Sequence, residues 1–288
     1  VVYITGAKVW SVPNSHDLEI VSKSFGRSLA WWWNYPCNDN DMSKLFVRDT
    51  YTNFADEKWT DNDAKLDATL RGASALIANP MQQGSASRIA LFGVGDYAWN
   101  HAGFKNEESY QASLQAVVGK GRAKAFDHLS KYLRYYDAEP LQTLISEYKT
   151  SSNAAPLMTE METLMTDCYT FMMMKHSKNK SDSLMYADIS PWVEKVSDMA
   201  YITHQLLAAI ETKEAGKPIS AVLQNKLLAL AEGLDDNGKY KFGVLNGMGD
   251  DINLSYISAE PAQKVMRPFI SFLADKLKKS SDSEDKNI

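Results

Sequence analysis

Three consecutive tryptophans, Trp31 to Trp33, are the feature that most limits how this chain can fold. They lie in the apolar run 29–33, and a polar segment containing Asn34 and Asp39 follows at once. A short apolar run that ends abruptly in polar, proline-containing sequence predicts a buried strand whose C-terminal end opens into a loop. In a parallel α/β barrel, active sites are built at that end of the strands.

Tryptophan, asparagine and aspartate at a strand end suit a sugar ligand. A flat aromatic ring can cover the apolar side of a pyranose, while amide and carboxylate groups can pair with its hydroxyls. A cluster of tryptophans is also commonly part of a hydrophobic core. From these residues alone, a sugar pocket and a core cluster both remain open.

The sequence around this run alternates between strand and helix patterns. Residues 1–4 are β-branched or aromatic and end at Thr5-Gly6, which predicts a buried strand. Residues 17–26 carry apolar positions at helical spacing and end in a glycine, which predicts a short helix with a glycine stop. Strands that alternate with helices predict a parallel sheet.

The pattern continues less clearly up to residue 105. We expect a long, variable loop over residues 40–60, a helix that begins at Asp61 or Asp63 and reaches Ala73, and a strand or helix end over 74–78. The apolar run 88–95 has the length of a strand, and Tyr97, Trp99 and Asn100 follow it. We assign these three residues to the strand end and to packing.

After residue 105, apolar positions recur at helical spacing. The pattern predicts five or six helices that form a bundle, with most methionines in its core and with turns at 235–238 and 243–251. A methionine-rich stretch can also line a binding groove, but its helical spacing favours the core. We expect residues 280–288 to be a charged, disordered tail.

Charge and cysteine content exclude several classes of function. The chain has 288 residues, a net charge of -5 and a pI near 5.6, which give no electrostatic case for binding nucleic acid or an anionic membrane. No apolar run approaches the ~20 residues of a membrane span. Cys37 and Cys168 indicate neither a disulfide framework nor a metal site, and we expect no cofactor. The strand-like start without a signal peptide predicts a piece of a longer protein.

Three ordered motifs resemble glycoside hydrolase family 84, the β-N-acetylglucosaminidases that include O-GlcNAcases and hyaluronidase-named bacterial relatives. They are residues 5–9 (TGAKV), residues 32–39 (WWNYPCND), and residues 79–81 (NPM) followed by 97–100 (YAWN). The resemblance implies the last strands and helices of a (β/α)8 TIM barrel over residues 1–105, and a helical bundle over 106–279. The implied fold class is therefore α/β followed by all-α.

The resemblance also implies an activity and a set of binding residues. Members of the family hydrolyse terminal β-linked N-acetylglucosamine by a retaining, substrate-assisted mechanism, in which the acetamido group of the sugar replaces a protein nucleophile. Asn34, Asp39 and Asn79 would bind sugar hydroxyls. Thr5 and Trp32 would wall the acetamide pocket, with Val9 near its rim.

The catalytic machinery of the family is incomplete in this chain. The pair of adjacent aspartates that acts as acid and base lies on an earlier strand in the family, before the segment that residues 5–9 match. We therefore expect the chain alone to be inactive, and to need the N-terminal part of the barrel or a second copy at its open sheet edge. Export to the periplasm or the outside is suggested by the family alone. The alternative is a non-catalytic carbohydrate-binding or helical interaction module.

Overall fold

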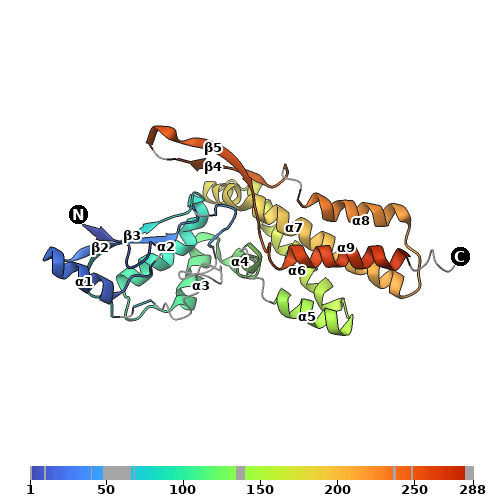
Figure 1. Ribbon diagram of the computed structural model, residues 1–288, viewed down its shortest axis with the longest axis horizontal. Helices are drawn as coiled ribbons and strands as arrows, with labels where there is room; N and C mark the ends of the chain where they lie inside the picture. The colour runs from blue at the N-terminus through green and yellow to red at the C-terminus, as the bar shows by residue number, and fades with distance from the viewer. Residues whose placement is uncertain are drawn as a thin grey trace. The chain divides into compact units, whose positions relative to one another are not determined.

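The structure is a computed structural model that divides into two compact units, Val1–Asp127 and His128–Ile288 (Figure 1). The division falls within a helix, whereas the sequence predicted a boundary at 105/106. The described residues are 2–9, 11–39, 41–47, 66–67, 69–133, 140–235, 238–247 and 249–282. The predicted loop over 40–60 therefore lies largely outside the described residues, as does the start of the helix expected at Asp61 or Asp63.

A parallel sheet forms the centre of the first unit. Its strands are β1 (Tyr3–Ile4), β2 (Leu29–Pro36) and β3 (Ala73–Asn79), in the order β1-β2-β3. Both neighbouring pairs are parallel, which confirms the predicted parallel sheet. The described residues of this unit hold three strands, so they form part of an α/β layer rather than a closed barrel.

Local sequence signals set the ends of α1 (Ser15–Phe25). The side chain of Asn14 accepts a hydrogen bond from the backbone N–H of Asp17, which satisfies a donor at the start of the helix. Gly26 ends the helix with φ of 62°, a left-handed conformation that glycine adopts without a steric penalty. The predicted helix with a glycine stop is confirmed.

Two predicted elements are wrong. The run 88–95 is part of a helix, α2 (Gly84–Trp99), and not a strand. Its buried residues recur at helical spacing, and a short apolar run cannot by itself distinguish a helix from a strand. Ala73 begins β3, so the helix expected to reach it does not include it. The buried positions of α2 are Ala86, Ser87, Ile89, Ala90, Gly93, Val94 and Tyr97.

The end of α2 partly corrects the roles assigned to Tyr97, Trp99 and Asn100. Tyr97 is buried, as expected for packing, but it lies near a helix end rather than a strand end. Trp99 is 91% exposed, so the packing role expected for it is wrong in this unit. Asn100 caps the helix, and its backbone N–H donates to the carbonyl of Asp96.

The core of the first unit lies on one face of the sheet. Trp31, Trp33 and Tyr35 alternate along β2 and are at most 3% exposed. They pack with Leu18 of α1 and with the apolar face of α2. Two helices, α3 (Asn106–Val117), which packs against α2, and α4 (Lys120–Leu133), follow in the chain.

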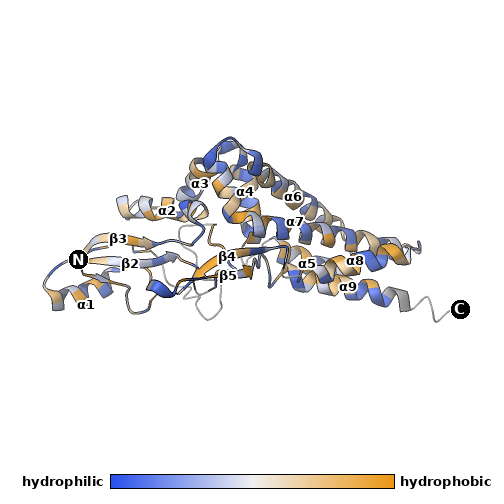
Figure 2. Cartoon of the chain, turned by 90° about the horizontal axis from the view of Figure 1, so that it is seen from above, coloured by the Kyte–Doolittle hydropathy of each residue, from blue (hydrophilic) through white to orange (hydrophobic). Residues whose placement is uncertain are grey.

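The second unit is built around one long helix, α7 (Lys180–Glu214), which packs against α6 (Ala155–Met172), α8 (Ala221–Gly233) and α9 (Met266–Asp282). The helix α5 (Leu141–Ser151) packs against α6, and the short 3-10 helix η1 (Met173–His176) joins α6 to α7. Hydrophilic and hydrophobic residues alternate along α6 and α7, as in amphipathic helices (Figure 2).

Two features of the second unit differ from the expectation of an all-α bundle. A β-hairpin is present, with β4 (Lys241–Asn246) antiparallel to β5 (Asn253–Ser258) (Figure 1). The predicted turn over 243–251 is therefore strand up to residue 246, and a short 3-10 helix η2 (Gly249–Asp251) lies in the connection. The predicted tail begins inside α9, whose last residue is Asp282.

The methionine-rich segment behaves only partly as core. Met161 and Met174 are buried, whereas Met173 is 50% exposed. Among the described residues, no helix has the length and apolar content needed to cross a membrane.

Candidate functional site

The predicted site residues of β2 lie on the face of the strand opposite the tryptophan core. Successive side chains of a strand point to opposite faces, so Trp32 and Asn34 face away from Trp31 and Trp33. Both are half-buried, whereas the core residues between them are almost fully buried. Trp31 and Trp33 are therefore core, whereas Trp32 lies on the other face, where the sugar pocket stays a prediction.

Asn34 lies at an irregularity in the sheet. The register of β2 and β3 pairs Trp33 with Ala78 and then Pro36 with Asn79, so two residues of β2 are left over. Such a bulge bends a strand and redirects a side chain, and bulges are common next to active sites. Here the bulge lies at the C-terminal ends of the parallel strands.

Three hydrogen bonds converge on the side-chain amide of Asn34. The indole N–H of Trp32 donates to Asn34 Oδ1 at 2.7 Å, and the amide nitrogen of Asn79 donates to the same oxygen at 3.0 Å. Asn34 Nδ2 donates to the backbone carbonyl of Val9 at 2.5 Å. Four of the six predicted site residues are thus joined in one network around Asn34.

The network determines which polar atoms remain for a ligand. An indole N–H can only donate, which fixes Oδ1 of Asn34 as the atom facing Trp32 and Asn79. Both acceptor positions of that oxygen are filled, and Asn34 keeps one N–H for a hydroxyl. Among the described residues, none donates to Asn79 Oδ1, so this oxygen can accept from a ligand.

The end of β1 lies beside Trp32. The register pairs Tyr3 with Ala30 and Ile4 with Trp31, so Thr5 follows at the level of Trp32. The rings of Tyr3 and Trp32 are 5.4 Å apart between centroids. Thr5 is half-buried at the same edge of the sheet, whereas the side chain of Val9 is 60% exposed.

Asp39 lies in the turn after β2 and is exposed. It is near Cys37, which is buried, and burial raises the pKa of the Cys37 thiol to about 11. A thiol with a raised pKa is a poor nucleophile, so the buried Cys37 fills space rather than acting as a reactive group. The hydrogen bonds of the described residues do not join Asp39 to the Asn34 network, so its binding role stays a prediction.

Sequence reasoning missed Asn38, which holds the turn in place. Asn38 is buried, and its Nδ2 donates to the backbone carbonyl of Lys44 at 2.8 Å and to Gln83 Oε1 at 3.1 Å. This amide links the turn after β2 to the start of α2. No sequence pattern signals the contact, because Asn38 and Gln83 are 45 residues apart.

Asp67 is a second residue that sequence reasoning missed, and it joins three elements of the first unit. It accepts hydrogen bonds from the backbone N–H and hydroxyl of Ser15, and from the backbone N–H and hydroxyl of Thr69. Burial acts to raise the pKa of Asp67, but these hydrogen bonds outweigh it and lower the pKa to about 2. The backbone carbonyl of Asp67 also accepts from Tyr97 Oη, so one residue ties α1, the segment before β3 and α2 together.

In the described part of the chain, no group of three or more His, Cys, Asp and Glu side chains could hold a metal ion. The Asn34 network consists of amides, an indole and a backbone carbonyl. These groups suit neutral hydroxyl-bearing ligands better than cations.

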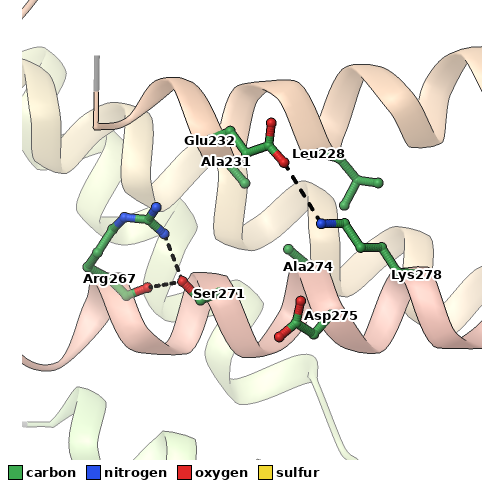
Figure 3. A pocket seen from close by; sticks show the side chains of 8 residues that line it. All are labelled: Leu228, Ala231, Glu232, Arg267, Ser271, Ala274, Asp275 and Lys278. Atoms are coloured by element: carbon green, nitrogen blue, oxygen red, sulfur yellow. Dashed lines mark hydrogen bonds and ion pairs between the residues drawn. The ribbon is translucent and has the colours of Figure 1, made fainter. Parts of the chain in front are cut away.

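The second unit contains a shallow groove between α8 and α9, with a volume of about 110 Å³ (Figure 3). Arg267 lies at one end, where it is held by Asp235 and donates to Ser271 Oγ at 3.0 Å. At the other end, Lys278 Nζ lies 3.8 Å from Glu232 Oε1. Because each cation already faces a carboxylate, the groove offers little to an anionic ligand.

A family model described as beta-N-acetylglucosaminidase matches residues 1–131. The match covers the strand ends that carry the Asn34 network and stops within α4. It therefore concerns the unit that contains the candidate site and leaves most of the second unit outside.

Similar solved structures extend over almost the whole chain. CpGH84D has a TM-score of 0.71 at 20% identity, with 96% of this chain and 44% of that chain covered. CpGH84B has a TM-score of 0.65 at 18% identity, with 94% of this chain and 44% of that chain covered. A mutant of the O-GlcNAc hydrolase of Thermobaculum terrenum has a TM-score of 0.68 at 16% identity, with 99% of this chain and 56% of that chain covered. This chain thus spans about half the length of the structures it matches, and at these identities the likeness concerns the fold.

The motifs at the strand ends predicted a resemblance to this family, and the family match and the structural neighbours bear out that resemblance. Residues 1–131 of this chain are thus similar to the beta-N-acetylglucosaminidases, and the fold is similar to that of solved structures of glycoside hydrolase family 84.

Proposed function

We propose that the first unit supplies the sugar-hydroxyl and acetamide-pocket side of a retaining, substrate-assisted β-N-acetylglucosaminidase. The ligand would be the terminal N-acetylglucosamine of a glycan or glycopeptide. The observation that supports this most is the Asn34 network, which brings Trp32, Asn79 and Val9 together at the ends of parallel strands.

The proposed division of labour follows from the polar atoms that remain. Asn79 Oδ1 accepts from one sugar hydroxyl, the remaining N–H of Asn34 donates to another, and the exposed carboxylate of Asp39 accepts from a third. Trp32 and Thr5 line the acetamide pocket. Buried pairs of this kind discriminate between epimers, because the wrong epimer leaves a polar group unpaired.

Hydrolysis needs an acid and a base in addition to this binding surface. The sequence contains adjacent aspartates only at 235–236 and 250–251, both in the second unit. We therefore propose that the chain alone binds the sugar without turning it over, and that catalysis requires further strands supplied by another segment or a second copy. Those strands would also pair the edges of the three-stranded sheet, which are costly to leave exposed.

The direct test is titration calorimetry of the chain with a thiazoline mimic of the N-acetylglucosamine oxazoline. The expected result is binding that Asp39→Ala and Asn79→Ala weaken, together with no release of aryl alcohol from an aryl N-acetylglucosaminide. A galacto-configured thiazoline serves as the epimer control.

A matched variant separates loss of the ligand contact from loss of the turn. Asp41→Ala removes a carboxylate two residues from Asp39, one that accepts from Ser43 and lies 3.0 Å from Lys44. It should leave the affinity unchanged. Equal weakening by both variants, or no binding by a folded chain, would leave the carbohydrate-binding proposal without support and favour a helical interaction module.

A further inference from the structure

The hairpin of the second unit is fixed at its base by side chains of α7. The ring centroids of Trp192 and Phe242 are 4.4 Å apart, which holds β4 against the helix. Lys195 is 4% exposed, and its Nζ donates at 2.9 Å to the backbone carbonyl of Ala259, just after β5. Contacts to both strands therefore keep the base of the hairpin in one position on α7.

Beyond this base the hairpin exposes large apolar side chains. The register pairs Leu245 with Leu254 and Gly243 with Tyr256, which puts these side chains on one face. A Cβ atom on Gly243 would lie 3.0 Å from Leu254, so the leucine lies directly over the glycine. Leu245, Leu254 and Tyr256 are between 57% and 63% exposed, and Ile252 at the tip is 56% exposed. An exposed apolar patch on a fixed element usually marks an interaction site.

This surface is also acidic. From residue 242 to residue 263 the sequence contains Asp250, Asp251 and Glu260 and no lysine or arginine. Asp250 and Asp251 are exposed at the tip beside Ile252. We refer to Leu245, Ile252, Leu254 and Tyr256, together with these two aspartates, as the hairpin patch.

The connection between α6 and α7 carries the opposite charge and a second set of exposed apolar side chains. Tyr169, Met173 and Leu184 are 63%, 50% and 47% exposed. Lys175, Lys178 and Lys180 are exposed between them. We refer to these six residues as the α6–α7 patch.

The positive charge of the α6–α7 patch is not neutralised by exposed acidic residues between residues 168 and 187. Between residues 168 and 187 the sequence contains one acidic residue, Asp182. It is 8% exposed and accepts a hydrogen bond from Ser177 Oγ at 2.9 Å. The exposed charge of this segment is therefore positive.

We propose that the hairpin patch of one copy binds the α6–α7 patch of a second copy, and that the reciprocal contact forms at the same time. The two patches match in apolar character and are opposite in charge, which gives specificity as well as attraction. Both lie in the second unit, so a twofold arrangement uses each patch once and leaves neither exposed. Within one copy the two patches do not cover each other, because the side chains of both are exposed.

An anionic membrane is the other surface that a basic, apolar patch can bind. The second copy is favoured because the chain itself carries the complementary surface. Asp250 and Asp251 would in addition be repelled by a negative bilayer.

Sedimentation velocity over a concentration series of the full chain measures the proposed contact. The expected result is a dimer whose dissociation constant rises at least about tenfold in Leu254→Ser/Tyr256→Ser, because apolar side chains at the centre of an interface carry most of the binding energy. The dimer should also weaken with added salt. The matched control is Val222→Ser, which changes an apolar residue of α8 that is 79% exposed and lies outside both patches.

Charge reversal tests the pairing of the two patches. One variant carries Asp250→Lys/Asp251→Lys, and the other carries Lys175→Glu/Lys178→Glu. Each alone should be monomeric, because its two patches then have the same sign of charge. Mixed together they should form a heterodimer in which both contacts are again complementary.

Three outcomes would overturn the proposal. The first is a monomer at every concentration of the unmodified chain. The second is a dimer that survives both charge reversals, as a dimer formed through the open edges of the N-terminal sheet would. The third is a monomer that floats with phosphatidylserine vesicles and stops doing so after Lys175→Glu/Lys178→Glu. Thermal unfolding followed by circular dichroism confirms that each variant is folded.

Discussion

The amide nitrogen of Asn79 donates to Asn34 Oδ1 at 3.0 Å and thereby joins the ends of two parallel strands. The same oxygen accepts the indole N–H of Trp32, so Asn34 orients both neighbours at once. Residues that hold ligand-binding groups in place contribute by reducing the freedom those groups would otherwise lose on binding. Asn34 is therefore both a proposed sugar ligand and a positioning residue.

The first prediction concerns this double role. Asn34→Leu should weaken thiazoline binding more than Asn79→Ala does, because it removes the remaining N–H and releases Trp32, Asn79 and Val9 together. Leaving the Trp32 N–H unpaired should also lower the free energy of unfolding by about 1–3 kcal/mol. Calorimetry and urea unfolding of both variants measure the two effects. Equal affinities for the two variants would contradict the positioning role.

The second prediction concerns Asp67. Asp67→Ala should lower the free energy of unfolding by about 1–3 kcal/mol, because the donors of Ser15 and Thr69 lose their acceptor. Thermal unfolding of the variant at neutral pH measures this loss. Asp17→Ala is the control, because it removes a carboxylate of α1 that accepts from the backbone N–H of Ala7.

Asp67 also predicts a dependence on pH. Its pKa is about 2 in the folded chain and near 3.8 without the fold, so its contribution is fully present above pH 4. The contribution falls as the pH drops from about 4 to 2, because the folded state then binds a proton that it disfavours. The difference in stability between the chain and Asp67→Ala should therefore shrink over that range. A difference that stays constant from pH 6 to pH 2 would contradict the hydrogen-bonded carboxylate.

The third prediction concerns His128, which bridges two carboxylates of α6. Its Nδ1 lies 2.6 Å from Asp167 Oδ2, and its Nε2 lies 2.9 Å from Glu160 Oε1, which also accepts from Tyr132 Oη. The hydrogen bonds to Asp167 and Glu160 outweigh burial and raise the pKa of His128 to about 9. A raised pKa means that the folded state favours the proton, so the stabilisation is complete below about pH 6.5 and is lost as the pH rises through 9.

His128→Gln should therefore be less stable than the chain at pH 6, and the two should converge toward pH 10. Urea unfolding at several pH values measures the difference. We expect about 1–3 kcal/mol at the lower pH for a half-buried, charge-assisted pair. His204→Gln is the matched control, since the carboxylate that His204 contacts, Glu162, has a side chain that is 64% exposed. A difference that does not change between pH 6 and pH 10 would contradict a charged His128.

Sequence reasoning located the strand ends correctly, because the motifs of residues 5–9, 32–39 and 79–81 fix which residues meet. It did not reveal that Trp32, Asn34 and Asn79 satisfy one another, since the bulge in β2 that brings them together is a property of strand pairing. Asp67 and Ser15 were missed for the same reason, because the contact between them spans 52 residues.

The other errors have local causes. The run 88–95 was too short to separate strand from helix, and the helical spacing becomes visible only when Ala86 and Tyr97 are included. The hairpin was missed although residues 241–246 and 253–258 each contain aromatic and β-branched residues and are separated by a glycine-containing turn. The strong helical pattern on both sides concealed that signal.

The fourth prediction concerns the base of the hairpin. Burial lowers the pKa of Lys195, and a buried charge is costly, so Lys195→Met should change the global free energy of unfolding by less than about 1 kcal/mol. The backbone carbonyl of Ala259 would lose its donor. The hydrogen bond from the backbone N–H of Ala259 to the carbonyl of Tyr240, 3.0 Å long, should then open more often.

Hydrogen exchange resolved by residue separates these two effects of Lys195→Met. The amides of β4 and β5 should exchange faster, while those of α6 and α7 stay protected. Lys239→Met is the matched control, because Lys239 pairs with Asp198 next to the same hairpin but has a side chain that is 59% exposed. Unchanged exchange in β4 and β5 would show that the contact between Trp192 and Phe242 holds the hairpin without help from the buried lysine.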